Sequence, residues 1–181
     1  MFFLRLFFEK IRRRISGEQS VRIFDVVILV DMQADYLKRI NKCKQARMIR
    51  GQIKVLRYCA SHDIPVVILE VVNKGKTINK LRKEVGKIPR YKTLIKKHND
   101  GFSEKDLLLI LKGWQALTLL FMGINATACV LDTAIRGKRY GFNILTTSCL
   151  MADPDSWKEN FWWFEKNGTH LDSVDRLLTQ T

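Results

Sequence analysis

Short apolar runs alternate with stretches of helical periodicity along this chain, and that alternation constrains the fold more than any other feature. The runs are rich in β-branched and aromatic residues and end at turn signals, which is typical of buried strands. Five strands are predicted, over residues 23–30, 65–72, 91–95, 117–122 and 142–147. Apolar residues at helical spacing predict helices over residues 40–61, 103–112, 127–140 and 155–167.

This order of strands and helices predicts an α/β fold of the doubly wound type. Parallel strands need crossover connections, and the crossover helices cover the faces of the sheet. We therefore expect a mostly parallel, five- or six-stranded sheet with helices on both faces, in a Rossmann-like three-layer arrangement. After the last predicted helix only residues 168–171 are available for a sixth strand, so that edge of the sheet should be short.

The chain is predicted to contain one domain and an N-terminal extension. Its 181 residues suffice for one ordinary globular domain, which we place at residues 21–181. Residues 1–20 carry apolar side chains at helical spacing among several Arg and Lys residues, and the segment is too short to span a bilayer. This basic amphipathic helix could pack on its own domain or on a partner subunit, or it could lie on a membrane surface.

Cysteine usage and charge bear on the compartment and the partners. The four cysteines show no metal-ligand spacing and follow no secretory signal, so we expect free thiols in the reducing cytoplasm. Lys and Arg number 32 against 18 Asp and Glu, a net charge of +14 that could attract an anionic substrate, nucleic acid or an anionic membrane surface. No nucleic-acid-binding motif accompanies that charge, so the only support for nucleic acid or a membrane as a partner is the charge itself.

One stretch concentrates the positive charge. Residues 73–97, here called the basic segment, contain ten basic residues against one acidic residue, Glu84. If this segment overhangs the strand ends, the substrate should be anionic. The alternative is a solvated basic surface unrelated to any pocket.

Polar residues follow three of the predicted strands. In a doubly wound sheet, ligands bind beyond the carboxyl ends of the strands. Asp31 follows the first strand, Lys96 follows the third, and Cys129 lies just beyond the fourth, in the first turn of a helix. The free N–H groups and the dipole of a helix N-terminus lower a thiol pKa, and the same N–H groups could stabilise an oxyanion.

Each of these residues also has a structural interpretation. Cys129 could be an inert core cysteine, Asp31 a helix cap or a member of a structural ion pair, and Lys96 part of a solvated surface. Taken together, a thiol, a carboxylate and a cation at neighbouring strand ends are the layout of an activated nucleophile with a proton acceptor and a charge stabiliser.

Three segments, in order, resemble the motifs of the isochorismatase-like cysteine hydrolases, which include nicotinamidases and related amidohydrolases. They are VDMQADY at residues 30–36, KKHNDGF at 96–102 and GINATACVLDTA at 123–134, the last followed by Gly141 and Phe142. The resemblance covers residues 23–153.

The resemblance implies a role for each matching residue. Cys129 would be the nucleophile, Asp31 the general base that takes its proton and later activates water, and Lys96 the group that stabilises charged intermediates. A cis peptide is expected around Ile124 and Asn125, with the backbone N–H groups of Asn125 and Cys129 as the oxyanion hole. The substrate-pocket candidates are Gln33, Tyr36, Phe102 and Ile124. A homo-oligomer is also implied.

Two departures from the family pattern narrow the expected activity. Nicotinamidases place histidines after the second strand to hold a divalent metal, whereas this chain has EVVNKGKTINK there, so we expect no metal, no other cofactor and no nicotinamidase activity. Members that cleave isochorismate lack the nucleophilic cysteine, so Cys129 argues against that reaction.

The sequence thus predicts a metal-independent cysteine hydrolase that cleaves an amide, imide or ester-like bond of a small molecule through a thioester acyl-enzyme. The alternative is a catalytically inactive protein of the same fold, a binding or scaffold protein whose basic surfaces dock nucleic acid, anionic lipid or an acidic protein.

Overall fold

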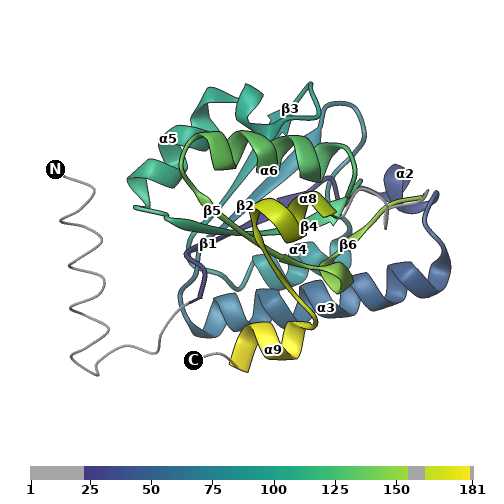
Figure 1. The fold of residues 1–181 in the computed structure, drawn as a ribbon. Coiled ribbons are helices and arrows are strands. Elements are labelled where there is room, and N and C mark those ends of the chain that lie inside the picture. Colours follow the sequence, from purple (N-terminus) through teal and green to yellow (C-terminus); the bar gives the residue numbers. More distant parts are fainter. Residues whose placement is uncertain (1–22, 155–161, 180–181) are drawn as a thin grey trace, which may run out of the picture.

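The structure is a computed structural model, and it describes residues 23–154 and 162–179 (Figure 1). The predicted N-terminal helix at residues 1–20 and the first part of the helix predicted at 155–167 lie outside the described residues. Within the described ranges, every helix is too short or too polar to cross a lipid bilayer.

A parallel sheet forms the middle layer of the fold. Its strands run in the order β3-β2-β1-β4-β5-β7, and a short β6 pairs with β4. The seven described strands are β1 (Val26–Val30), β2 (Val66–Val71), β3 (Tyr91–Lys96), β4 (Thr118–Ile124), β5 (Asn143–Thr147), β6 (Met151–Ala152) and β7 (Thr169–Leu171). The predicted count of five or six strands is therefore too low, because β6 has only two residues and so shows no periodicity. The short edge strand expected within residues 168–171 is confirmed as β7.

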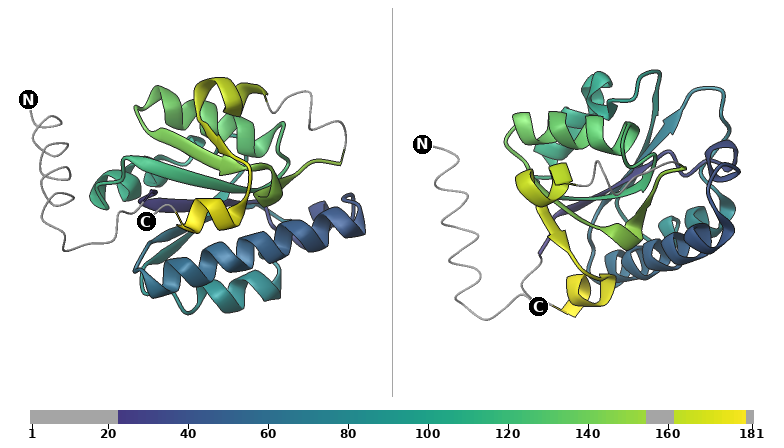
Figure 2. Two further views of the ribbon diagram at one scale, coloured as in Figure 1. Left: turned by 60° about the horizontal axis from the view of Figure 1, so that its bottom comes forward. Right: turned by 45° about the vertical axis from the view of Figure 1, so that its right-hand side comes forward.

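Helices cover both faces of this sheet, as the doubly wound prediction requires (Figure 2). The helices α3 (Lys42–Ser61), α4 (Asn79–Val85) and α9 (Val174–Thr179) lie on one face, and α5 (Lys105–Gly113), α6 (Cys129–Arg139) and α8 (Trp162–Asn167) lie on the other. The remaining described helical elements are α2 (Ala34–Leu37), η1 (Gly101–Ser103) and η2 (Ser148–Leu150). The helices α2, α4 and α9 were not predicted, because they are too short to show a clear apolar stripe.

The central strands are buried on both faces, which explains their continuous apolar sequences. Every residue of β1 is buried, and β1 pairs with both β2 and β4. The strand begins at Val26 rather than at residue 23, and the Asp25 carboxylate before it accepts hydrogen bonds from the backbone N–H groups of Leu117 and Thr118, each at 2.9 Å.

The carboxyl ends of β1 and β4 approach each other closely at Gly123. This glycine has a φ of +144°, and a Cβ atom built on it would lie 2.1 Å from the carbonyl oxygen of Val30. Only glycine fits such a conformation and such a close approach. The contact places the residue after β1 beside the turn that follows β4.

Candidate active site

Asp31 and Lys96 form a buried ion pair at the carboxyl ends of β1 and β3. Both side chains are fully buried, and Lys96 Nζ donates to Asp31 Oδ2 at 2.8 Å. Lys96 Nζ also donates to the carbonyl oxygen of His98 at 3.1 Å. Asp31 has a left-handed φ of 52°, and its N–H donates to the carbonyl of Leu69 at 2.9 Å. An acidic residue whose backbone has this uncommon conformation at a strand end is typical of functional sites.

Cys129 is the first residue of α6, and the residue is 4% exposed. The turn before it is held by the segment at β6: Ala126 N–H donates to the carbonyl of Ala152 at 3.1 Å, and Asp153 accepts from both the N–H and the hydroxyl of Thr127. The peptide bond between Ile124 and Asn125 is cis, as expected. These contacts fix where α6 starts and therefore where the thiol lies.

The protonation state of Cys129 differs from the expectation. Burial and, after it, the nearby charge of Asp31 raise the pKa of this thiol to about 12, and Lys96 only partly opposes them. The predicted lowering by the helix N-terminus is therefore wrong, because a dipole effect of about 0.3–1 kcal/mol is smaller than the cost of a buried thiolate beside a carboxylate. At rest the residue is a neutral thiol.

Asp31 is placed to accept the proton of that thiol. Burial raises the pKa of the Asp31 carboxyl, against the opposing charge of Lys96, which makes the carboxylate a stronger base than an exposed one. Among the described residues, Asp31 Oδ1 is buried and has no hydrogen-bond partner, while Oδ2 is taken by Lys96. One carboxylate oxygen is thus anchored and the other is available.

Two of the four pocket candidates, Tyr36 and Ile124, follow or end the strands that lead to Asp31 and Cys129. Tyr36 is half-buried on α2, and burial and the charge of Asp31 raise the pKa of its hydroxyl. Ile124 is the buried last residue of β4.

The other two candidates have structural contacts instead. The Gln33 side chain donates to the carbonyls of Val71 and Gly75 and accepts from the Val71 N–H, so it anchors the loop after β2. Phe102 packs its ring near Phe142 and Tyr140, at the opposite end of α6 from Cys129.

Three polar residues near Cys129 were missed as functional residues. Asn99 Oδ1 accepts a hydrogen bond from the Cys129 thiol at 3.5 Å. Thr133 donates to the Cys129 carbonyl at 2.6 Å and accepts from the Gly101 N–H at 2.9 Å, which ties the loop after β3 to α6. Asp153 holds the turn before Cys129. Asn99 and Thr133 lie inside the quoted motifs, but spacing alone does not reveal which side chains point at the sulfur.

The carboxylate near the end of β2 has a structural contact. Glu70, within β2, accepts a hydrogen bond from the backbone N–H of Thr77 at 2.6 Å. Across residues 23–154 and 162–179, no three His, Cys, Asp or Glu side chains gather as metal ligands.

The basic segment does not gather around the thiol as a unit. Lys96 is inside the site, whereas Lys87 pairs with Glu84 and Arg90 with Asp63. Lys76 and Arg82 line a groove beside β3 that is described below. The idea that these cations overhang Cys129 is therefore not supported by their positions.

The order of these elements and the polar cluster at the strand ends define a hydrolase-like α/β site, and comparison with known proteins gives its family. The family model of the isochorismatase domain matches residues 25–169. The chain belongs to the isochorismatase-like hydrolase family. A search of curated proteins finds no match.

Solved structures of similar fold share little sequence with this chain. The MAR1 ribonuclease from Caenorhabditis elegans superposes with a TM-score of 0.77 at 17% identity, over 87% of this chain and 82% of that one. N-carbamoylsarcosine amidase from Thermoplasma acidophilum has a TM-score of 0.71 at 19% identity, over 83% and 96%. The YcaC gene product from Escherichia coli, described as an octameric hydrolase of unknown specificity, has a TM-score of 0.73 at 16% identity, over 90% and 82%. At such identities the likeness establishes the fold.

Proposed function

We propose that this protein is a metal-independent cysteine hydrolase that cleaves an amide, imide or ester-like bond of a small molecule. The observation that carries the proposal is the convergence of Asp31, Lys96 and Cys129, from three separate strand ends, into one buried cluster. Amidases among proteins of the same fold agree with this reaction class.

The reaction begins with proton transfer. As Cys129 Sγ attacks the substrate carbonyl carbon, its proton passes to Asp31 Oδ1, since a thiol with a pKa of about 12 needs a base at the moment of attack. The oxyanion that forms is stabilised by the Lys96 ammonium and by the N–H groups of Asn125 and Cys129. Cys129 N–H begins a helix, so it has no carbonyl partner within α6.

The second half of the proposed reaction regenerates the free enzyme. The C–N or C–O bond breaks, the leaving group takes the proton from Asp31, and a thioester remains on Cys129. Asp31 then takes a proton from water, which attacks the thioester carbon; the acid product leaves, and the sulfur regains the proton. Tyr36 and Asn99, both near the thiol, are the side chains placed to contact the substrate.

The test is a screen of small amides, imides and esters by intact-protein mass spectrometry after rapid acid quench. The expected result is an adduct at Cys129 with at least one substrate class, turnover in the wild type, and loss of both in Cys129→Ala. Cys149→Ala is the matched control and should keep both. Absence of adduct and turnover across the three classes, in folded protein, would contradict the proposal.

Two further properties are proposed, a compartment and an oligomeric state. The described thiols are all free, which suits the reducing cytoplasm expected from the sequence. A homo-oligomer is suggested by the octameric relative of the same fold, and sedimentation velocity of the full chain would test it.

The second candidate function is an inactive scaffold that docks a polyanion. It is favoured by the cations of the basic segment that form no ion pair within the described part of the chain, such as Lys76 and Arg82. A scaffold should bind RNA or anionic vesicles equally well before and after Cys129→Ala, with a steep salt dependence.

A further inference from the structure

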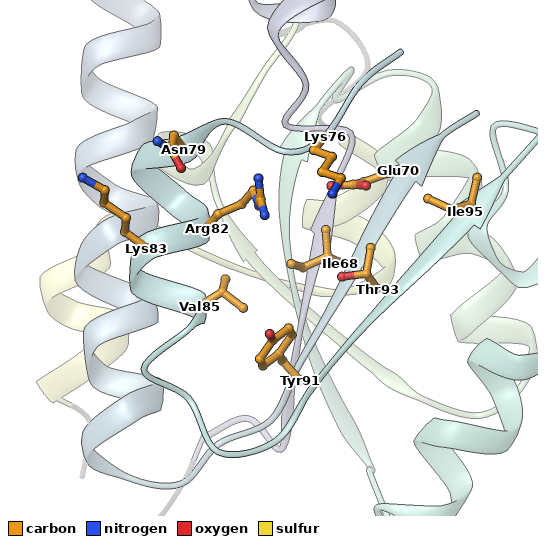
Figure 3. Close-up of a pocket in the computed structure, with 10 residues that line it drawn as sticks. All are labelled: Ile68, Glu70, Lys76, Asn79, Arg82, Lys83, Val85, Tyr91, Thr93 and Ile95. Atoms are coloured by element: carbon orange, nitrogen blue, oxygen red, sulfur yellow. The ribbon is translucent and has the colours of Figure 1, made fainter. Parts of the chain in front are cut away.

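A groove lies between α4 and the edge of the sheet, away from the proposed nucleophile (Figure 3). Its volume is about 440 Å³, which is within the usual range of small-molecule sites, roughly 300–1,000 Å³. It is lined by β2, β3 and α4 with Ile68, Glu70, Lys76, Asn79, Arg82, Lys83, Val85, Tyr91, Thr93 and Ile95.

The groove exists because α4 is short. With seven residues, α4 leaves part of the outer face of β3 uncovered. Tyr91 and Ile95, on that face, are 46% and 52% exposed. In a doubly wound fold such apolar strand surface is normally covered by a helix, so its exposure here marks it as a surface available to a ligand.

The groove lies on the opposite face of the sheet from the active-site cation. Successive residues of a strand point to opposite faces, so Ile95 faces the groove while Lys96 faces Asp31. A ligand in the groove would therefore not contact Cys129.

The lining has one apolar region and one cationic region. Ile68, Val85 and Tyr91 supply apolar and aromatic surface, while Lys76 and Arg82 extend over the strands from α4 and the loop before it (Figure 3). Within the described residues, neither of these cations has a carboxylate within ion-pair distance, unlike the neighbouring Lys87.

The carboxylate in the groove offsets only part of this positive charge. Glu70 is 5% exposed and directs one oxygen to the backbone N–H of Thr77 at 2.6 Å. With Lys83 the lining carries three cations against one carboxylate, so the groove is positive overall.

We propose that this groove binds a phosphomonoester with an aromatic ring, of the size of a nucleoside monophosphate. The Arg82 guanidinium matches a phosphate group in a bidentate manner, and the Lys76 ammonium adds a second charge. The ring of the ligand lies against Tyr91 and the aliphatic side chains. The site goes beyond the proposed hydrolase activity and does not depend on it.

The experiment is isothermal titration calorimetry of the full chain with adenosine monophosphate, adenosine and inorganic phosphate as probes. Because both regions contribute, adenosine monophosphate should bind at least about tenfold more tightly than either fragment. Arg82→Gln should weaken its binding about tenfold or more, as expected for a lost charge-assisted hydrogen bond worth about 1.5–3 kcal/mol. Tyr91→Ala should weaken the binding of the nucleotide but not the binding of inorganic phosphate.

Two controls separate this site from general charge attraction and from the active site. Lys80 is exposed on α4 but does not line the groove, so Lys80→Gln removes the same charge and should change affinity less than about twofold. Cys129→Ala should leave binding unchanged. Equal losses for Lys80→Gln and Arg82→Gln, phosphate binding as tight as the nucleotide, or tight binding only to RNA oligonucleotides would each overturn the proposal.

Discussion

Replacing Asp31 with asparagine should make Cys129 more reactive toward an alkylating agent while it abolishes turnover. The carboxylate raises the pKa of the thiol through its charge, whereas Lys96 lowers it. Asparagine removes the negative charge and leaves the cation, so the thiol pKa must fall from about 12. The same substitution removes the base that the proposed reaction needs.

The magnitude follows from the electrostatics of the pair. Two like charges a few ångströms apart in partly screened surroundings repel by about 1–4 kcal/mol, which corresponds to roughly one to three pKa units. At pH 8 the thiolate population, about one in 10⁴ for a pKa of 12, would rise about 10- to 1000-fold. A more acidic thiol is also a weaker nucleophile, so the alkylation rate should rise about 3- to 30-fold.

The assay is alkylation by iodoacetamide at pH 8, followed for each cysteine by peptide mass spectrometry. Cys43 is exposed and provides the internal reference in every sample. Asp35→Asn is the matched control, since Asp35 is an exposed carboxylate that does not affect the Cys129 thiol. Circular dichroism should establish that the Asp31→Asn protein is folded.

A slower alkylation of Cys129 in folded Asp31→Asn would refute this reasoning, because it would mean that the carboxylate promotes thiolate formation at rest. The pH profile of wild-type turnover adds a second check. Burial raises the pKa of Asp31 above its ordinary value of 3.8, and the base must be ionised, so kcat/KM should fall as the pH decreases through a value higher than 3.8. An acid limb below that value would contradict the assignment.

Three further substitutions test the packing around the site. Gly123→Ala should destabilise the fold by more than about 3 kcal/mol in urea unfolding because its Cβ would strike the backbone of β1, whereas Gly113→Ala, with open space around it, should change stability by less than about 1 kcal/mol. Thr133→Val should cost about 1–3 kcal/mol and lower kcat, while Thr133→Ser keeps both hydrogen bonds and should restore kcat. Lys96→Met should lower the free energy of unfolding by about 3–5 kcal/mol, because it leaves a buried carboxylate without its partner. Lys38→Met breaks an exposed ion pair and should leave stability unchanged. Equal effects of the two substitutions in thermal or urea unfolding would contradict the argument from the buried pair.

The fold class and the common location of three site residues could be predicted from the sequence. Apolar runs place strand ends within a few residues, and the parallel arrangement brings those ends to one edge of the sheet. For that reason Asp31, Lys96 and Cys129 could be assigned to one site from the sequence. Their common location depends on topology, and topology follows from the alternation of elements.

What the sequence could not supply depends on burial and on side-chain direction. The raised pKa of Cys129 results from desolvation and a neighbouring carboxylate, neither of which is visible in the helix-terminus pattern. Gln33 matches a family motif, yet its side-chain amide is hydrogen-bonded to the backbone at the end of β2. The groove beside α4 arises from a helix too short to leave a periodic signal.

The buried ion pair has a consequence for charge balance during the proposed reaction. With a neutral thiol, the carboxylate and the ammonium cancel, and after proton transfer the substrate oxyanion replaces the carboxylate as the negative partner of Lys96. The enclosed site thus remains electroneutral through acylation and needs no counterion from solvent. The rate of the chemical step should therefore respond little to ionic strength, whereas binding in the open cationic groove should weaken steeply with added salt. One titration with salt would therefore distinguish the active site on one face of the sheet from the groove on the other.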